Sequence, residues 1–211
     1  MIERVEFASC YVYSPCGTCE TSERSRILRA LLKSGNTRMM AKYAARVREQ
    51  ASERGRLAGF FDATDILVPV PGCEPTTPGS TSVTDTLAAA LLREGIGYAA
   101  WGGLRRVRAV RKSATAPPRE RPAVGSHYDT LAVVCMGEFS RSPRLVLIDD
   151  VITTGRTLLA AAMRLHGAFP LARLRAFALL RTMGLVADVE RLLDPCVGEI
   201  RWRAGDARRC P

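Results

Sequence analysis

Two adjacent carboxylates and a small-residue turn occur together in one short segment, Arg144 to Thr157. The segment begins with an apolar run from Leu145 to Ile148, whose length and composition favour a buried parallel strand over a helix. Asp149 and Asp150 then stand at the carboxyl end of that strand. In open α/β sheets this edge is where ligands bind, so the two acids are candidate functional residues.

The turn after the two acids has the composition of an anion-binding loop. It offers hydroxyl groups, a glycine that permits close backbone approach, and free N–H groups at the start of a helix. Its residues are Thr153, Thr154, Gly155, Arg156 and Thr157. Because carboxylates repel a phosphate, we expect Asp149 and Asp150 to contact sugar hydroxyls or a Mg²⁺ ion coordinated through oxygen and water. The segment is therefore suited to a ribose 5-phosphate.

The same segment resembles the phosphoribosyl pyrophosphate signature of the type I phosphoribosyltransferases, without a gap. The resemblance implies an α/β fold with a central, mainly parallel sheet flanked by helices and a small hood formed by the chain ends. It also implies that Asp149 and Asp150 are catalytic, contact the ribose hydroxyls and hold Mg²⁺, in part through water. The residues from Thr153 to Thr157 would then bind the 5-phosphate.

A generic strand and turn of another α/β protein is the competing interpretation, including the acidic strand end of a nucleoside triphosphatase. The chain contains no G-x-x-x-x-G-K-[ST] segment, so that second class lacks its phosphate-binding loop.

A second candidate loop follows an expected core strand from Asp65 to Val70. Loops at the carboxyl ends of strands are candidate sites, and the resemblance implies that this one binds pyrophosphate through its backbone amides. Its residues are Val70, Pro71, Gly72 and Cys73. No basic residue occurs between Asp65 and Val83, which departs from the family pattern, and an ordinary proline-rich connection is the alternative.

Residues 103–126 form a third candidate, a long loop rich in arginine and interrupted by prolines. Loops of this length within a compact domain are usually functional or disordered. We expect Arg111 and Lys112 to reach the pyrophosphate, with Arg119 and Arg121 as alternates. A solvated basic loop without a ligand is the competing interpretation.

The remaining pattern predicts three regions. Residues 1–62 form a flank, with a strand over residues 3–14 that lies outside the central parallel set, a helix ending at Lys33 and a basic helix from Thr37 toward Arg54. Residues 63–182 form the core, including a helix over Ser82 to Glu94 and a strand over His127 to Val134, where His127 is expected to be structural. Residues 183–211 add a helix around Leu185 to Leu193 and an edge strand.

The bulk composition permits one α/β domain in a chain of 211 residues. No stretch approaches the about 18 to 20 apolar residues of a membrane span, and residues 1–7 carry charges, so we expect a cytoplasmic protein without a membrane partner. Cys10, Cys16 and Cys19 cluster among seven cysteines, but they offer three thiolates where structural zinc takes four ligands. Zinc at these positions stays an open question.

The formal net charge of +10 calls for an anionic partner, either a small polyanion or nucleic acid. The basic segments lack the interleaved aromatic residues that stack on single strands, so nucleic acid is not favoured. The order of the elements also resembles the competence protein F-like branch of the phosphoribosyltransferases. That resemblance implies Mg²⁺-dependent transfer of phosphoribose from phosphoribosyl pyrophosphate to a nucleobase-like acceptor, with release of pyrophosphate.

Two alternatives to an enzyme stay open. The first is a non-catalytic regulator that binds phosphoribosyl pyrophosphate, and it is favoured by the missing basic residue near the first loop. The second is a basic nucleic-acid-binding protein. A homodimer is also open, and the acceptor itself is not identified by the sequence.

Overall fold

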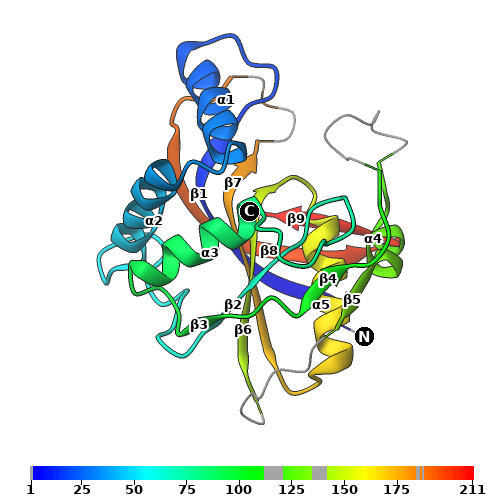
Figure 1. The fold of residues 1–211 in the computed structure, drawn as a ribbon. Coiled ribbons are helices and arrows are strands. Elements are labelled where there is room, and N and C mark those ends of the chain that lie inside the picture. The colour runs from blue at the N-terminus through cyan, green and yellow to red at the C-terminus, as the bar shows by residue number, and fades with distance from the viewer. Residues whose placement is uncertain (1, 112–120, 135–141, 184–185, 187) are drawn as a thin grey trace.

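A computed structural model describes residues 2–111, 121–134, 142–183, 186 and 188–211 of the chain. Within these residues, seven strands form one twisted sheet (Figure 1). In their order across the sheet they are β3 (Ala99–Ala100), β2 (Ile66–Pro69), β6 (Arg144–Ile152), β7 (Arg173–Thr182), β1 (Arg4–Tyr13), β8 (Leu193–Arg203) and β9 (Asp206–Cys210). The first five are mutually parallel, whereas β8 is antiparallel to both of its neighbours, β1 and β9.

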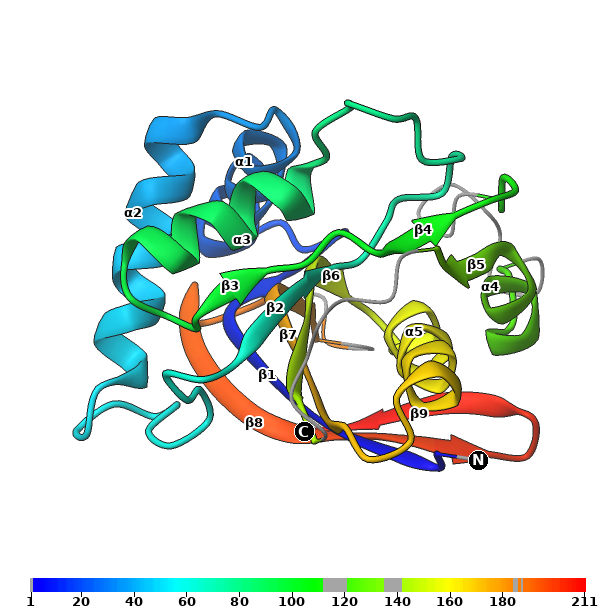
Figure 2. The same ribbon diagram turned by 60° about the horizontal axis from the view of Figure 1, so that its bottom comes forward.

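Helices cover both faces of this sheet (Figure 2). On one face lie α1 (Glu20–Lys33), α2 (Thr37–Ala51) and α3 (Val83–Arg93), and on the other lie α4 (Val124–Thr130) and α5 (Arg156–Ala168). A small antiparallel pair, β4 (Leu104–Arg106) and β5 (Leu131–Val133), lies beside α4. The predicted α/β class, with a mainly parallel sheet between helices, is confirmed.

Strand β6 is the buried centre of the site region. It pairs with β2 on one side and β7 on the other, so it lies inside the sheet and its side chains pack against a hydrophobic layer on each face. Val146 and Ile148 pack on the side of α1 to α3, whereas Leu145 and Leu147 pack on the side of α5. This double burial explains why the strand shows a continuous apolar run rather than an alternating pattern.

Three helix boundaries follow from residues that cap them. The side chain of Asn36 accepts a hydrogen bond from the Met39 N–H at the start of α2. At the start of α1, the side chain of Cys19 accepts a hydrogen bond from the Ser22 N–H. Ser82 and Asp85 form a reciprocal capping box at the start of α3, where the expected helix begins. Local sequence therefore fixes where these helices start.

The first strand differs from its prediction. β1 lies inside the central sheet, where it pairs in parallel with β7 and antiparallel with β8, rather than outside the parallel set. Phe7 packs on one face and Ala8 on the other, and both are fully buried. A strand that is apolar on both faces needs a central position, which its loose alternation in the sequence did not indicate.

Two predictions near the basic loop are also corrected. His127 lies in α4 rather than in a strand, because Val124, His127 and Thr130 bury one helical face, and the strand begins only at Leu131. The loop itself is shorter than residues 103–126, since Leu104–Arg106 pairs with β5. Lys112 and Arg119 lie outside the described residues.

The helix expected around Leu185 to Leu193 is wrong for the residues that the structure describes there. Leu193 starts β8, which pairs with β1, and the described residues before it are turns, bends and irregular backbone. The Asp188 carboxylate accepts hydrogen bonds from the Thr18 and Cys19 N–H groups at 2.6 and 2.9 Å, which holds this segment against the start of α1.

Within the described part of the chain, no helix combines the length and apolarity that crossing a membrane requires.

Removing the α3 capping box should lower stability without changing the fold. We expect Ser82→Ala to reduce the free energy of unfolding by about 1 kcal/mol, because the Asp85 N–H loses its 3.1 Å partner. Urea denaturation of both proteins measures the difference. The neighbouring exposed Thr81→Ala serves as the control, and equal effects of the two substitutions would contradict a capping role.

Candidate functional site

The carboxyl ends of β6, β7 and β1 meet the start of α5 around a cavity of about 650 Å³. One wall is the continuous segment from Asp149 to Leu158, and Thr182 of β7 adjoins it. Another part of the wall comes from Tyr13 at the end of β1 and from Arg29 and Lys33 of α1. The structure thus brings the acidic pair and the entire predicted phosphate turn to one hollow at the predicted sheet edge.

Asp149 lies within the last part of β6, because the strand continues to Ile152 instead of ending at Ile148. Strand β7 runs alongside and extends the pairing, with Asp149 opposite Ala178 and Val151 opposite Leu180. The Asp149 carboxylate accepts a 2.8 Å hydrogen bond from the Asp150 N–H. Burial, reinforced by the neighbouring Asp150 charge, raises the pKa of Asp149 well above its ordinary value.

Asp150 has a different environment, because a cation already binds it. Its side chain is 10% exposed, its Oδ1 accepts a 2.8 Å hydrogen bond from the Val151 N–H, and its Oδ2 forms an ion pair with Lys33 Nζ. The Lys33 side chain itself is 47% exposed. A sugar hydroxyl or a metal ion can therefore reach Asp150 only by sharing or displacing this ammonium group.

The turn between β6 and α5 is open to the cavity. Thr153 and Thr154 are exposed, and Gly155 precedes the first residue of α5 with φ of +88°. No side chain caps the start of α5. Because the first N–H groups of a helix need partners and carry partial positive charge, this uncapped end favours an anion.

The Arg156 guanidinium is engaged away from that anion position. Its Nε donates to both carboxylate oxygens of Asp206, at 2.7 and 3.0 Å, and Nη2 adds a further bond to Asp206. Its Nη1 donates to the Arg121 carbonyl at 3.3 Å. Arg156 borders the cavity as predicted, but its charge is balanced by Asp206, so the turn's attraction for an anion comes from its backbone and hydroxyls.

The predicted pyrophosphate loop starts next to the acidic pair and then turns away. The Val70 N–H donates to the Ile148 carbonyl at 2.9 Å, which puts the loop one strand from Asp149. Arg106 Nε donates to the Gly72 carbonyl at 2.7 Å, and the Val110 N–H donates to the Cys73 carbonyl at 2.8 Å. None of the residues from Val70 to Cys73 belongs to the wall of the 650 Å³ cavity.

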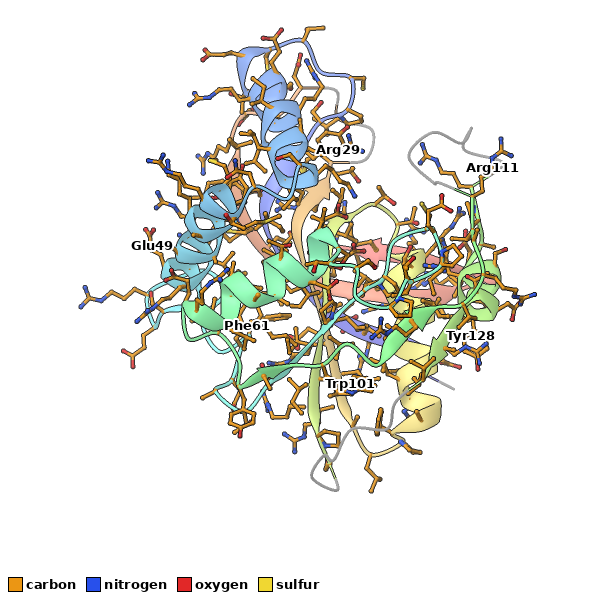
Figure 3. All side chains as sticks on the ribbon, in the orientation of Figure 1. Arg29, Glu49, Phe61, Trp101, Arg111 and Tyr128 are labelled. Carbon is orange, nitrogen blue, oxygen red and sulfur yellow. The ribbon has the colours of Figure 1, made fainter. Side chains whose placement is uncertain are left out.

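Arg106 supplies the basic group that the sequence around this loop lacks. It is 2% exposed, donates to the Thr130 hydroxyl at 2.5 Å as well as to Gly72, and burial lowers its pKa. Nothing in the sequence indicated the contact between Arg106 and Gly72, because it forms only when β4 folds back against the loop from Val70 to Cys73. Among the other predicted cations, Arg121 lines the cavity, whereas Arg111 does not. Figure 3 places Arg29 beside α1 and Arg111 well away from it.

Several cavity residues were missed by the sequence reasoning. They are Tyr13, Arg29, Lys33 and Arg209. The Arg209 guanidinium, from the last strand, donates to the Thr182 carbonyl, and burial followed by the nearby Arg181 charge lowers its pKa. The sequence did contain an indication for the two residues of α1. Arg29 and Lys33 each follow a buried leucine, Leu28 and Leu32, so they lie beside the buried face of the helix.

The cysteines do not form the zinc site that was left open. Cys10 is fully buried in the layer under α1 and α2, whereas Cys16 is exposed and Cys19 caps α1. Among the described residues, no group of three or more His, Cys, Asp or Glu side chains could hold a metal ion. Any cation in the cavity therefore depends on Asp149, Asp150 and ligand oxygens.

No protein-family model matches this chain, and no curated protein matches it. Its structure is similar to a hypoxanthine phosphoribosyltransferase from Staphylococcus aureus, with a TM-score of 0.38 and 10% identity over 72% of this chain and 70% of that one. It is also similar to the adenine phosphoribosyltransferase of Trypanosoma brucei in complex with AMP, pyrophosphate and ribose-5-phosphate, with a TM-score of 0.38 and 17% identity over 88% and 80% of the two chains. The enzyme of Leishmania tarentolae gives 0.33 and 16%, over 82% and 83%. At these TM-scores the likeness carries no argument about this chain, so its function must be argued from its own site.

Gly155 should tolerate no larger residue. A Cβ there would approach the Ile200 side chain to 2.8 Å, and its φ of +88° is costly for any L side chain. We expect Gly155→Ala to lower the free energy of unfolding by about 2 kcal/mol, measured by urea denaturation. Gly167→Ala, in the same helix with open space around it, is the matched control and should be neutral or stabilising.

His127 should make stability depend on pH. It is 4% exposed, and burial, followed by the charges of Arg106 and Arg156, lowers its pKa to about 4. The unfolded chain takes up a proton near pH 6.5 that the folded state refuses until about pH 4, so unfolding becomes easier as the pH falls between these values, by up to about 3 kcal/mol.

Denaturation of the wild type and of His127→Leu between pH 7 and pH 4 tests this dependence. The unfolding free energy of the wild type should fall more steeply than that of His127→Leu as the pH decreases. Parallel curves for wild type and His127→Leu would refute the assignment.

Proposed function

We propose that this chain is a phosphoribosyltransferase that binds phosphoribosyl pyrophosphate with Mg²⁺ and transfers phosphoribose to a nitrogenous acceptor, releasing pyrophosphate. One observation carries the proposal. A pair of strand-end carboxylates and the uncapped start of α5 lie on the same cavity wall, within one continuous segment from Asp149 to Leu158. That arrangement suits a molecule with a hydroxyl-bearing ring and a phosphate at one end.

The 5-phosphate belongs at the turn. Thr153 and Thr154 are exposed, and the start of α5 has no side-chain cap, so hydroxyls and backbone N–H groups are available to a dianion. Gly155 lets the chain turn at positive φ against Ile200 without a side chain in the way. The anion then completes the hydrogen bonding of the helix start.

The ribose hydroxyls belong at the acidic pair. Burial and the neighbouring Asp150 charge raise the pKa of Asp149, so hydroxyl donors or a cation would stabilise its charged form. During transfer the sugar carbon becomes positively charged, and carboxylates stabilise that state more than they stabilise the starting sugar. Lys33 limits the negative charge on Asp150 and holds its orientation.

The donor set fits Mg²⁺ in a restricted way. Mg²⁺ in substrate complexes commonly uses one or two carboxylates, water and phosphate oxygens, and this cavity offers Asp149, with Asp150 reached through water because Lys33 engages it. When bound, the ion would neutralise charge on the leaving pyrophosphate. Arg106 and Arg121 supply cationic charge from the protein near the same region.

The regulator that binds but does not react is the second candidate, and the Lys33–Asp150 ion pair favours it. By neutralising Asp150, Lys33 reduces the negative charge that could stabilise the positively charged sugar during transfer, whereas binding alone does not need that charge. Release of pyrophosphate in the presence of a panel of nitrogen heterocycles separates the two functions. The finer likeness to the competence protein F-like branch, the nucleobase-like acceptor and a homodimer stay predictions.

Neutralising the acidic pair should abolish binding of phosphoribosyl pyrophosphate. We expect Asp149→Asn combined with Asp150→Asn to weaken binding by at least about a hundredfold, because charge-assisted hydrogen bonds to the ribose are lost. Isothermal titration calorimetry with Mg²⁺ present measures the effect. Asp129→Asn, an exposed acid outside the cavity wall, is the control, and unchanged affinity in the double variant would reject the site assignment.

A further inference from the structure

The wall of the cavity holds an arginine whose charge the described residues do not balance. Helix α1 carries four basic side chains, Arg24, Arg26, Arg29 and Lys33. Arg24 pairs with Glu20, and Lys33 pairs with Asp150. Arg26 donates to the Gly17 carbonyl at 2.7 Å. Arg29, by contrast, has no carboxylate partner among the described residues, and it borders the cavity.

An aromatic ring holds Arg29 in place. Its guanidinium carbon lies 5.4 Å from the centroid of the Tyr13 ring, and both residues are partly buried. A guanidinium stacked on a ring keeps its N–H edge for a planar, bidentate acceptor, and a carboxylate is such a group. The cavity therefore presents a positioned, cationic edge together with an aromatic surface.

The sheet order puts this edge on the acceptor side of the site. The loop predicted to bind pyrophosphate follows β2, which neighbours β6 on one side, whereas Tyr13 ends β1, two strands away on the other side. Adjacent strands are about 4.8 Å apart, so the end of β1 lies about 10 Å from that of β6. In a displacement at the sugar carbon, the entering and leaving groups occupy opposite sides. Arg29 thus faces the entering group rather than the leaving pyrophosphate.

We infer that the acceptor is a planar nitrogen heterocycle that carries a carboxylate, an inference that rests on the proposed function. Arg29, stacked on Tyr13, is then the residue that binds this carboxylate and determines acceptor specificity. A neutral heterocycle would desolvate the Arg29 charge without pairing it, which costs binding free energy. A carboxylated one pairs it. The basic wall of the cavity discriminates acceptors by charge.

Pyrophosphate release with matched acceptors tests the inference. The probes are uracil-6-carboxylate against uracil, and pyridine-3-carboxylate against pyridine-3-carboxamide. For the wild type we expect at least one carboxylated member to have a kcat/KM about tenfold or more above its neutral counterpart. Arg29→Met should bring that ratio close to one, and Arg29→Lys should leave an intermediate ratio, because it keeps the charge without the bidentate edge.

Two further measurements make failure of the inference distinguishable from failure of the proposed function. Arg24→Met removes the same charge from the same helix outside the cavity wall, and it should keep the wild-type ratio. Calorimetry with phosphoribosyl pyrophosphate and Mg²⁺ should give similar affinities for the wild type and Arg29→Met.

Lack of phosphoribosyl pyrophosphate binding by the wild type would overturn the proposed function and the inference together. Binding without any preference for a carboxylated acceptor, whether both members of a pair react or neither does, would overturn the inference alone. A large loss of phosphoribosyl pyrophosphate affinity in Arg29→Met would also overturn it, since Arg29 would then serve the sugar phosphate.

Discussion

Two like charges on consecutive residues at the end of a buried strand are the constraint around which this site is arranged. Asp149 and Asp150 repel each other, and burial removes the water that would screen them. The protein resolves the conflict unequally, because Lys33 neutralises Asp150 while Asp149 retains a raised pKa. The last residue of α1 is thereby tied to the end of β6, and this contact brings Arg29 and the Tyr13 wall over the acidic pair.

Much of the protein's positive charge is used in this way, inside the molecule. Arg156 is balanced by Asp206, Arg144 by Asp65, and Arg181 by Asp194. Arg106 and Arg209 bond to carbonyl oxygens in partly dehydrated surroundings, which is why their pKa values fall. The wall of one cavity includes five basic side chains, from Arg29, Lys33, Arg121, Arg156 and Arg209, and two acidic ones, from Asp149 and Asp150.

The central strand, the turn and the helix after it were predictable, because they depend on local pattern. A continuous apolar run is typical of a strand that is buried on both faces. A glycine that follows two threonines and precedes a helix is typical of a turn that permits close backbone approach. The starts of α2 and α3 were also predicted near Thr37 and Ser82, and the structure shows short-range caps at both starts, from Asn36 and Ser82.

The strand expected at His127 was a local error, because Val124, His127 and Thr130 form one buried helical face, but other errors concern long-range pairing. Nothing local in the first strand indicates that it will lie between β7 and β8, and nothing local in residues 183–192 indicates that Asp188 will bond to the backbone before α1. Arg106 reaches Gly72 because β4 folds back, and Lys33 reaches Asp150 because α1 packs against β1 in the same sheet. Such contacts join residues remote in sequence, and a single sequence carries no pairwise signal for them.

The location of β1 also has a consequence for how the chain assembles. β1 finds its two partners in β7 and β8, which follow it only after most of the described chain, so the two halves of the sheet join through pairings between residues far apart in sequence. Until those pairings form, the apolar faces of Phe7 and Ala8 lack their neighbours, and a nascent chain of this topology depends on slow, distant encounters. Loss of β8 and β9 would turn the buried strand β1 into an unpaired edge.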